Sequence, residues 1–189
     1  MKVLNRLFQK LLFNDGLEYY KTRSGAFIGV NALCASRTLK ALCSLGELTA
    51  VSKVEKIDIC IYRSEEKRIL SAYNKKVLSN NDWKKIILRK LNNLYFGMEF
   101  NEFLEVLIER KKRGMFIDKH FAPCFLGGVV NVSIDNKKAL CSALEIDNQI
   151  LNDLHVASSE SVISKHFELK QSLTPSELNL LNQYLDLYE

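Results

Sequence analysis

The most informative part of the chain is residues 28–63, which read IGVNALCASRTLKALCSLGELTAVSKVEKIDICIYR. In its first half, and just before it, apolar side chains recur at helical spacing, which predicts two short helices at roughly 26–33 and 37–45. Ser36 is a suitable N-cap for the second helix, and Gly46 suits the position just after its end. The first half therefore predicts a pair of short helices.

The second half of this stretch changes to a repeat of two residues. Apolar or small side chains alternate with polar ones at Leu48 and Ala50, and then at Ile57, Ile59 and Ile61. Such alternation is typical of β-strands that bury one face. Residues 52–56 are polar enough to turn between the two runs, so we expect a β-hairpin directly after the helix pair.

The order of these elements suggests a known kind of module. Ser36–Lys40 begins the second helix, Leu45–Leu48 follows it, and the expected hairpin ends in Ile61–Arg63. This arrangement resembles the recognition helix and wing of winged-helix DNA-binding proteins, in which a helix enters the major groove. The resemblance implies these DNA contacts: Ser36 at the helix start, Arg37, Thr38, Lys40 and Ser44 on the groove side, and Lys53 and Lys56 on the wing.

The net charge is divided unevenly along the chain. The 189 residues carry a formal charge of +5, but residues 1–95 hold 18 Lys and Arg against 8 Asp and Glu, whereas residues 96–189 hold 9 against 14. The first part is therefore net +10 and the second net −5. Because neutralisation of phosphates by Lys and Arg dominates affinity for DNA, the basic part favours double-stranded DNA as the partner.

The rest of the chain is mainly helical by pattern. A helix is expected at 2–13, another runs from acidic residues near Glu99 to basic residues before Gly114, and Thr174–Glu177 is a capping box for the last helix. We expect an α+β fold that is predominantly helical. Residues 1–78 would form a basic winged-helix-like region with its β-hairpin, and residues 79–189 a helical, net acidic region with one short strand.

Two apolar stripes in the second region are candidates for a dimer or partner surface. They consist of Leu178, Leu181, Leu185 and Tyr188, and of Phe100, Phe103 and Leu107. Stripes of this kind also form the core faces of helices. The sequence therefore leaves open a homodimer, a protein partner bound through the C-terminal helices, and simple core packing.

No motif with known catalytic mechanics is present. The chain has neither GxxxxGK[ST] nor GxSxG. His120 and Cys124 have ligand-like spacing, but the remaining Cys and His are too scattered to complete a zinc site. Glu145 and Asp147 lack the nearby lysine that a nuclease pair would use. We therefore expect no enzyme, metal or cofactor, although a cysteine nucleophile stays open because its partners need not be close in sequence.

The composition and the cysteines bound the class of protein. With 47% hydrophobic and 26% charged residues, the chain lies in the globular range and outside the disordered and collagen-like classes. Its five cysteines are an odd number without a CxxC pair, which suggests buried thiols in a reducing compartment. The N-terminus lacks a signal-peptide pattern, and no apolar run reaches the roughly 20 residues of a membrane span. A cytoplasmic protein without membrane contact is expected.

Taken together, these features favour a small DNA-binding protein that regulates transcription through a helix-turn-helix and wing. The alternative is a protein-binding adaptor, chaperone or immunity-type inhibitor without nucleic-acid contact. In that alternative the oppositely charged regions steer a charged protein partner rather than DNA.

Overall fold

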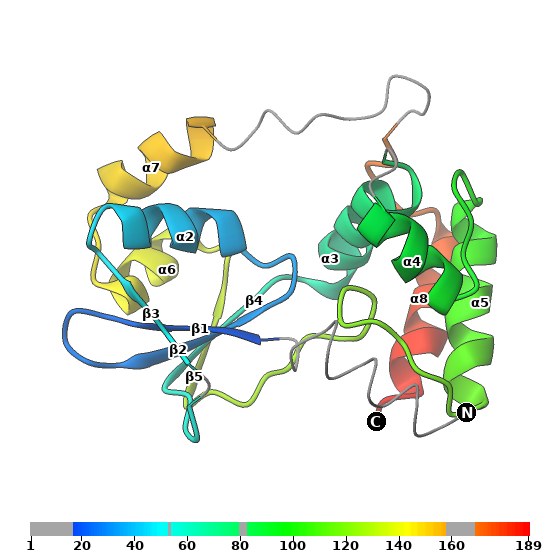
Figure 1. The fold of residues 1–189 in the computed structure, drawn as a ribbon, viewed down its shortest axis with the longest axis horizontal. Coiled ribbons are helices and arrows are strands. Elements are labelled where there is room, and N and C mark those ends of the chain that lie inside the picture. Colours follow the sequence, from blue (N-terminus) through cyan, green and yellow to red (C-terminus); the bar gives the residue numbers. More distant parts are fainter. Residues whose placement is uncertain (1–16, 53, 80–82, 158–168) are drawn as a thin grey trace. The chain divides into compact units, whose positions relative to one another are not determined.

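The computed structural model describes residues 17–52, 54–79, 83–157 and 169–189, which form two compact units (Figure 1). The sheet unit comprises residues 16–64 and 124–161, and the helical unit comprises residues 1–15, 65–123 and 162–189. The predicted boundary between 1–78 and 79–189 falls inside the helical unit, and a role of the second region in dimerisation stays a prediction.

The sheet unit is built on five strands. They are β1 (Leu17–Lys21), β2 (Phe27–Asn31), β3 (Thr49–Val51), β4 (Ile59–Tyr62) and β5 (Val130–Ser133). Their order in the sheet is β3-β1-β2-β4-β5. β1 is antiparallel to both β2 and β3, whereas β2, β4 and β5 run parallel. The sheet is therefore mixed, with a parallel half made of strands far apart in sequence.

The predicted β-hairpin is wrong. The two runs of alternating residues do form β3 and β4, but β1 and β2 lie between them in the sheet. Ile59, Cys60 and Ile61 are all buried, as expected of a parallel strand rather than of a wing with one solvated face. Without a hairpin there is no wing, so the predicted winged-helix region and the predominantly helical α+β class are both wrong.

The first predicted helix of the pair is also wrong, because residues 27–31 form β2. Its core, Ile28 to Val30, is a short continuous apolar run that pairs with β1 on one side and β4 on the other. Short apolar runs do not distinguish a buried strand from a buried helix by periodicity alone. The second helix is confirmed as α2 (Ser36–Ser44). Gly46 follows it with φ of +75°, and the Gly46 and Glu47 N–H groups close the helix end on Cys43 O and Leu42 O.

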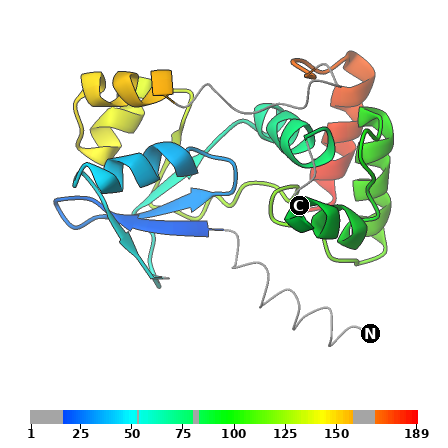
Figure 2. The same cartoon turned by 45° about the horizontal axis from the view of Figure 1, so that its top comes forward.

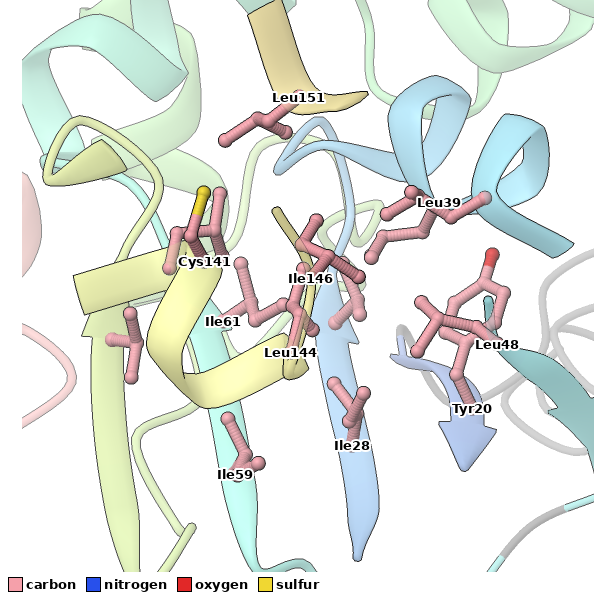
Figure 3. Packing of buried hydrophobic residues seen from close by; sticks show 14 of the residues in the cluster. Tyr20, Ile28, Leu39, Leu48, Ile59, Ile61, Cys141, Leu144, Ile146 and Leu151 are labelled. Atoms are coloured by element: carbon pink, nitrogen blue, oxygen red, sulfur yellow. The ribbon is translucent and has the colours of Figure 1, made fainter. Parts of the chain in front are cut away.

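Three helices cover one face of the sheet: α2, α6 (Lys137–Leu144) and α7 (Asn148–Ala157) (Figure 2). Figure 3 shows Ile28, Ile59 and Ile61 of the sheet packed with side chains of these helices. The same cluster includes Leu39, Leu144 and Leu151 of these helices. Burial of each such side chain is worth about 1.5–3 kcal/mol, so this core fixes α2 on the sheet.

The helical unit consists of α3 (Glu65–Ala72), the π-helix η1 (Tyr73–Val77), α4 (Trp83–Leu91), α5 (Phe100–Lys112) and α8 (Pro175–Asp186). α5 packs against α8. Phe100, Phe103 and Leu107 are fully buried there, as is Leu181. Of the alternatives left open for the stripes, core packing is therefore confirmed for these four residues, and a dimer or partner surface is wrong for them.

Other expectations concern single elements. The capping box at the start of α8 is confirmed: the Thr174 hydroxyl accepts from the Glu177 N–H, and the Glu177 carboxylate accepts from the Thr174 N–H. The helix predicted at 2–13 lies outside the described residues. No helix in the described ranges has the length and apolar character needed to cross a membrane.

Candidate functional site

The carboxyl ends of β2 and β4 form the point at which the sheet's connections diverge. After β2 the chain passes through α2 to β3 at one edge, and after β4 it passes to β5 at the other edge. Ligands of open α/β sheets bind in the crevice outside the strand ends at such a point. Val30 of β2 lies opposite Ile61 of β4. Continuing this register places the β2–α2 loop, residues 32–35, beside Arg63.

The β2–α2 loop has an unusual backbone. Leu33 and Ala35 have φ angles of 65° and 62°, in the left-handed region that glycine favours. This conformation costs an L-residue roughly 1–2 kcal/mol. Backbone strain of this kind persists only where the surrounding structure enforces it, and it clusters at binding sites. The strained backbone makes this loop a candidate part of a binding site.

α2 begins at the end of this loop without a side-chain cap. Ala35 is its N-cap residue, and its first turn contains no acidic residue. The first N–H groups of a helix have no intrahelical partner and carry the positive end of the helix dipole. A phosphate or sulfate group suits such an end, because it accepts hydrogen bonds from several N–H groups and is attracted by the dipole.

Arg63 supplies a second positive group at the same strand ends. It directly follows β4, and its backbone carbonyl accepts from the Cys124 thiol. Its Nε atom is buried and has no hydrogen-bond partner in the described part of the chain. A buried polar atom without a partner costs about 1–3 kcal/mol, so its presence calls for an explanation. An anionic ligand that accepts from the guanidinium provides one.

Asn31 holds the ends of these strands in place. Its side-chain amide donates to Ile61 O at 3.2 Å and to Phe125 O at 2.9 Å. Its carbonyl Oδ1 accepts from the Phe125 N–H at 2.6 Å. Asn31 is buried, so these bonds fix the end of β2 against β4 and against the segment after Cys124. The β2–α2 loop therefore starts from a rigid base.

The structure places the residues implied by the winged-helix resemblance as follows. Ser36 is the first residue of α2, Arg37 is exposed, Thr38 is buried, Lys40 pairs with Glu18 at 2.9 Å, and the Ser44 hydroxyl donates to Lys40 O. Lys56 is exposed on the segment before β4, and Lys53 lies outside the described residues. Only the start of α2 is brought to the strand ends by the β2–α2 connection. Lys56 stands at the opposite, amino end of β4.

The helical unit contains a carboxylate–imidazole pair that sequence reasoning missed. Asp118 is fully buried, and its Oδ1 accepts from the His120 N–H at 2.9 Å and contacts His120 Nδ1. An imidazole that donates through Nδ1 to Asp118 Oδ1 directs Nε2 away from the carboxylate, where it can accept a hydrogen bond. This is the arrangement of a general base whose tautomer a carboxylate fixes. The sequence shows only His120 two residues after Asp118 in an irregular segment.

Arg68 of α3 anchors the segment that carries this pair. Its guanidinium is almost completely buried, donates to His120 O at 3.0 Å and to Phe121 O at 3.3 Å, and pairs with Glu65 at 2.8 Å. The Tyr184 hydroxyl also donates to Phe121 O. The backbone around His120 is therefore held from two helices.

The described ranges contain no group of three or more His, Cys, Asp or Glu side chains that is placed to hold a metal ion.

Comparison with known proteins gives the family. A model of the Sulfotransferase family matches residues 2–173, which include both strand ends and the His120 segment. The chain belongs to the sulfotransferase family. No curated protein and no solved structure matches this sulfotransferase.

This membership overturns the functional interpretation of the sequence. The expectations of a non-enzyme, a transcription regulator, a DNA partner and an adaptor, chaperone or inhibitor are wrong, because the matched family is one of enzymes. The motif search failed because it was limited to a few known patterns such as GxxxxGK[ST] and GxSxG, and an enzyme can lack all of them. The basic first half of the chain misled for a physical reason, since positive charge suits a small anionic substrate as well as DNA.

Proposed function

We propose that this sulfotransferase moves a sulfuryl group from a nucleotide phosphosulfate to a hydroxyl or amine acceptor, and that the sheet unit holds the donor's anionic groups. Family membership supports the reaction. The single observation that carries the site is the buried Arg63 Nε without a partner, at the end of β4. A phosphosulfate, the mixed anhydride of sulfuric and phosphoric acid, fits this site because its oxygens only accept hydrogen bonds while the groups at the site donate them.

Within the sheet unit, two sets of donors have separate roles. The N–H groups at the start of α2 bind phosphate oxygens, and the helix dipole adds attraction along the same direction. The Arg63 guanidinium binds two oxygens at once through its planar fork. The donor supplies an anhydride bond whose cleavage leaves a stable phosphate. Negative charge grows on that phosphate during transfer, so donors already in position stabilise the transition state.

Within the helical unit, His120 is the candidate general base. An imidazole held in this way can take a proton from a hydroxyl group, which makes the oxygen a nucleophile. Asp118 holds the proton of the other ring nitrogen, Nδ1, in place and stabilises the positive charge that forms on the ring when Nε2 takes up a proton. Arg68 acts as a positioning residue, because it holds the backbone carbonyl of His120 and not the reacting atoms.

We place the reaction in the cytoplasm as part of the same proposal. The sequence supports this compartment, because its five cysteines are an odd number and include no CxxC pair, which is typical of thiols in a reducing compartment. Cell fractionation tests this, and recovery of the protein only from an oxidising compartment contradicts it.

The donor site is tested by replacing Arg63 with Met and measuring the affinity for an adenosine phosphosulfate at fixed ionic strength. Loss of a two-pronged charged contact costs about 2–4 kcal/mol, so we expect Kd to rise roughly 30- to 700-fold. The matched control is Arg23→Met in the same unit. The Arg23 side chain is 64% exposed and pairs with Glu47. The Arg23→Met substitution therefore removes the same charge as Arg63→Met.

The two variants separate specific binding from general charge. We expect Arg23→Met to change Kd less than about threefold, because an exposed charge acts on a ligand only through screened solvent. The thermal stability of Arg63→Met should equal or exceed that of the wild type, since Arg63 Nε has no partner to lose. Equal donor affinity in the two variants would rule out Arg63 as a donor-binding residue.

A further inference from the structure

Two thiols from distant parts of the chain meet at the donor site of the sheet unit. Cys34 lies in the β2–α2 loop, and its Sγ is 3.9 Å from the Sγ of Cys124, 90 positions later. The Cys124 thiol also lies 3.7 Å from Arg63 O. One sulfur thus belongs to the loop before α2, and the other contacts the backbone of the residue that follows β4. The pair touches both elements to which the donor site is assigned.

The backbone on each side of the pair is already held together. The Cys34 N–H donates to Asn31 O at 3.0 Å, which fixes the start of the loop. Phe125, the residue after Cys124, exchanges hydrogen bonds of 2.9 and 2.6 Å with the Asn31 side chain. A bond between the sulfurs needs them to approach to about 2.05 Å, a movement of roughly 2 Å. The two sulfurs therefore start within about 2 Å of bonding distance, on backbone segments that are each held by hydrogen bonds.

A third sulfur nearby has a different role. The Cys60 thiol donates to Phe125 O at 3.0 Å and accepts a longer contact from the Asn31 amide. Burial raises the pKa of Cys60, although its contacts with Asn31 and nearby backbone lower it in part. The Cys60 thiol therefore supports the backbone at this point through its bond to Phe125 O.

We propose that Cys34 and Cys124 form a thiol modification site, in which a reversible disulfide between them lowers binding of the phosphosulfate donor. This inference rests on the donor site proposed above. The oxidant is a small disulfide such as oxidised glutathione. Cys124 is the entry point because it is partly exposed, whereas Cys34 is completely buried.

The exchange is balanced in two steps. The Cys124 thiolate attacks one sulfur of the glutathione disulfide, which forms a mixed disulfide and releases one glutathione thiolate that takes up a proton. The Cys34 thiolate then attacks the Cys124 sulfur, which closes the internal disulfide and releases the second glutathione. Two protein thiols are oxidised and one glutathione disulfide is reduced. One equivalent of a dithiol, or two of reduced glutathione, reverses the process.

The bond acts on the donor site through the loop. A movement of the loop sulfur by up to 2 Å shifts the strained residues Leu33 and Ala35, which set the position of the α2 N–H groups. A misplacement of about 1 Å in a positioned site can cost roughly a hundredfold in function. We expect the oxidised protein to bind an adenosine phosphosulfate at least about tenfold more weakly than the reduced protein.

A disulfide between Cys34 and Cys124 can be identified by peptide mapping. Cleavage after Lys and Arg puts each of the five cysteines on a different peptide, and those of Cys34 and Cys124 are 24–37 and 120–137. The full chain is equilibrated with reduced and oxidised glutathione at several ratios, alkylated, digested and weighed by mass spectrometry. Donor affinity is measured on the same samples, with and without dithiothreitol. Cys124→Ser removes the bond, and Cys43→Ser is the matched control.

The expected result is a linked 24–37/120–137 pair whose amount rises as donor affinity falls, with recovery in dithiothreitol. Cys124→Ser should bind donor equally well at every ratio, and Cys43→Ser should behave as the wild type does. Absence of the linked pair, or a linked protein with unchanged affinity, overturns the inference while leaving the donor site standing. A reduced wild type that fails to bind donor overturns the proposed function and the regulatory step. In that case the amount of linked peptide still shows whether Cys34 and Cys124 form a disulfide, because it is measured independently of donor binding.

Discussion

Replacing Arg68 with Met tests how the helical unit holds its candidate base. The change removes two hydrogen bonds to the carbonyls of His120 and Phe121 and the pair with Glu65. The Arg68 side chain is 2% exposed, so its partners lose their bonds inside the protein. Breaking a buried charged pair in this way costs about 3–5 kcal/mol. Because Met fills much of the same volume, the cavity adds little to that cost.

Thermal and chemical unfolding measure this cost. For a chain of this size, 1 kcal/mol corresponds to roughly 2–4 °C in Tm, so we expect a decrease of about 6–20 °C. The matched control is Arg113→Met, which breaks the exposed pair between Arg113 and Glu109 and should cost less than about 1 kcal/mol. The kcat of Arg68→Met should also fall, with little change in donor Kd, because His120 loses its support. Equal Tm values for the two variants would refute the reasoning from burial.

The remaining predictions concern stability at two other points. Thr174→Ala removes the cap of α8 and should cost about 1 kcal/mol in urea unfolding at neutral pH. Burial alone would raise the pKa of Glu177, but its bonds with Lys170 and Thr174 outweigh burial and lower it. Its stabilising effect is therefore present above the ordinary value of about 4.3 and is lost as pH falls below it, so Glu177→Gln should flatten the acid side of the stability profile. A profile that keeps its full acid slope contradicts this. Gly128→Ala places a Cβ 2.7 Å from Cys60 N and should destabilise by about 1–3 kcal/mol; an unchanged Tm would show that the β4–β5 backbone yields at no cost.

Local signals in the sequence predicted single elements well. Gly46 marked the end of α2 because left-handed termination depends on neighbouring residues alone. Ser36 was wrong as the N-cap, since Ala35 takes that position and no side chain caps the helix. The Thr174 box marked the start of α8 because a capping box also depends on neighbouring residues alone. Residues 27–31 were misread as helix because a strand buried on both sides shows no alternation. The pairing of β4 was misread because alternation identifies a strand without identifying its neighbour.

The candidate site was the least predictable part. Arg63 was visible at the end of the second alternating run, but only the parallel pairing of β4 with β2 brings it beside the loop before α2. Cys34 and Cys124 are 90 positions apart, so no spacing pattern could join them. His120 was weighed only as a metal ligand, since the role of Asp118 depends on burial that sequence does not display. Charge alone could not separate DNA from a small anionic donor.

The most direct test of the account is sulfuryl transfer itself. The full chain is incubated with a radiosulfur-labelled adenosine phosphosulfate and a panel of hydroxyl and amine acceptors, and label in the acceptors is counted for the wild type, Arg63→Met and Arg23→Met. We predict transfer by the wild type and by Arg23→Met, and less than about a tenth of that rate for Arg63→Met at limiting donor. Transfer by Arg63→Met at the wild-type rate, or no transfer to any acceptor by the wild type, would contradict the account.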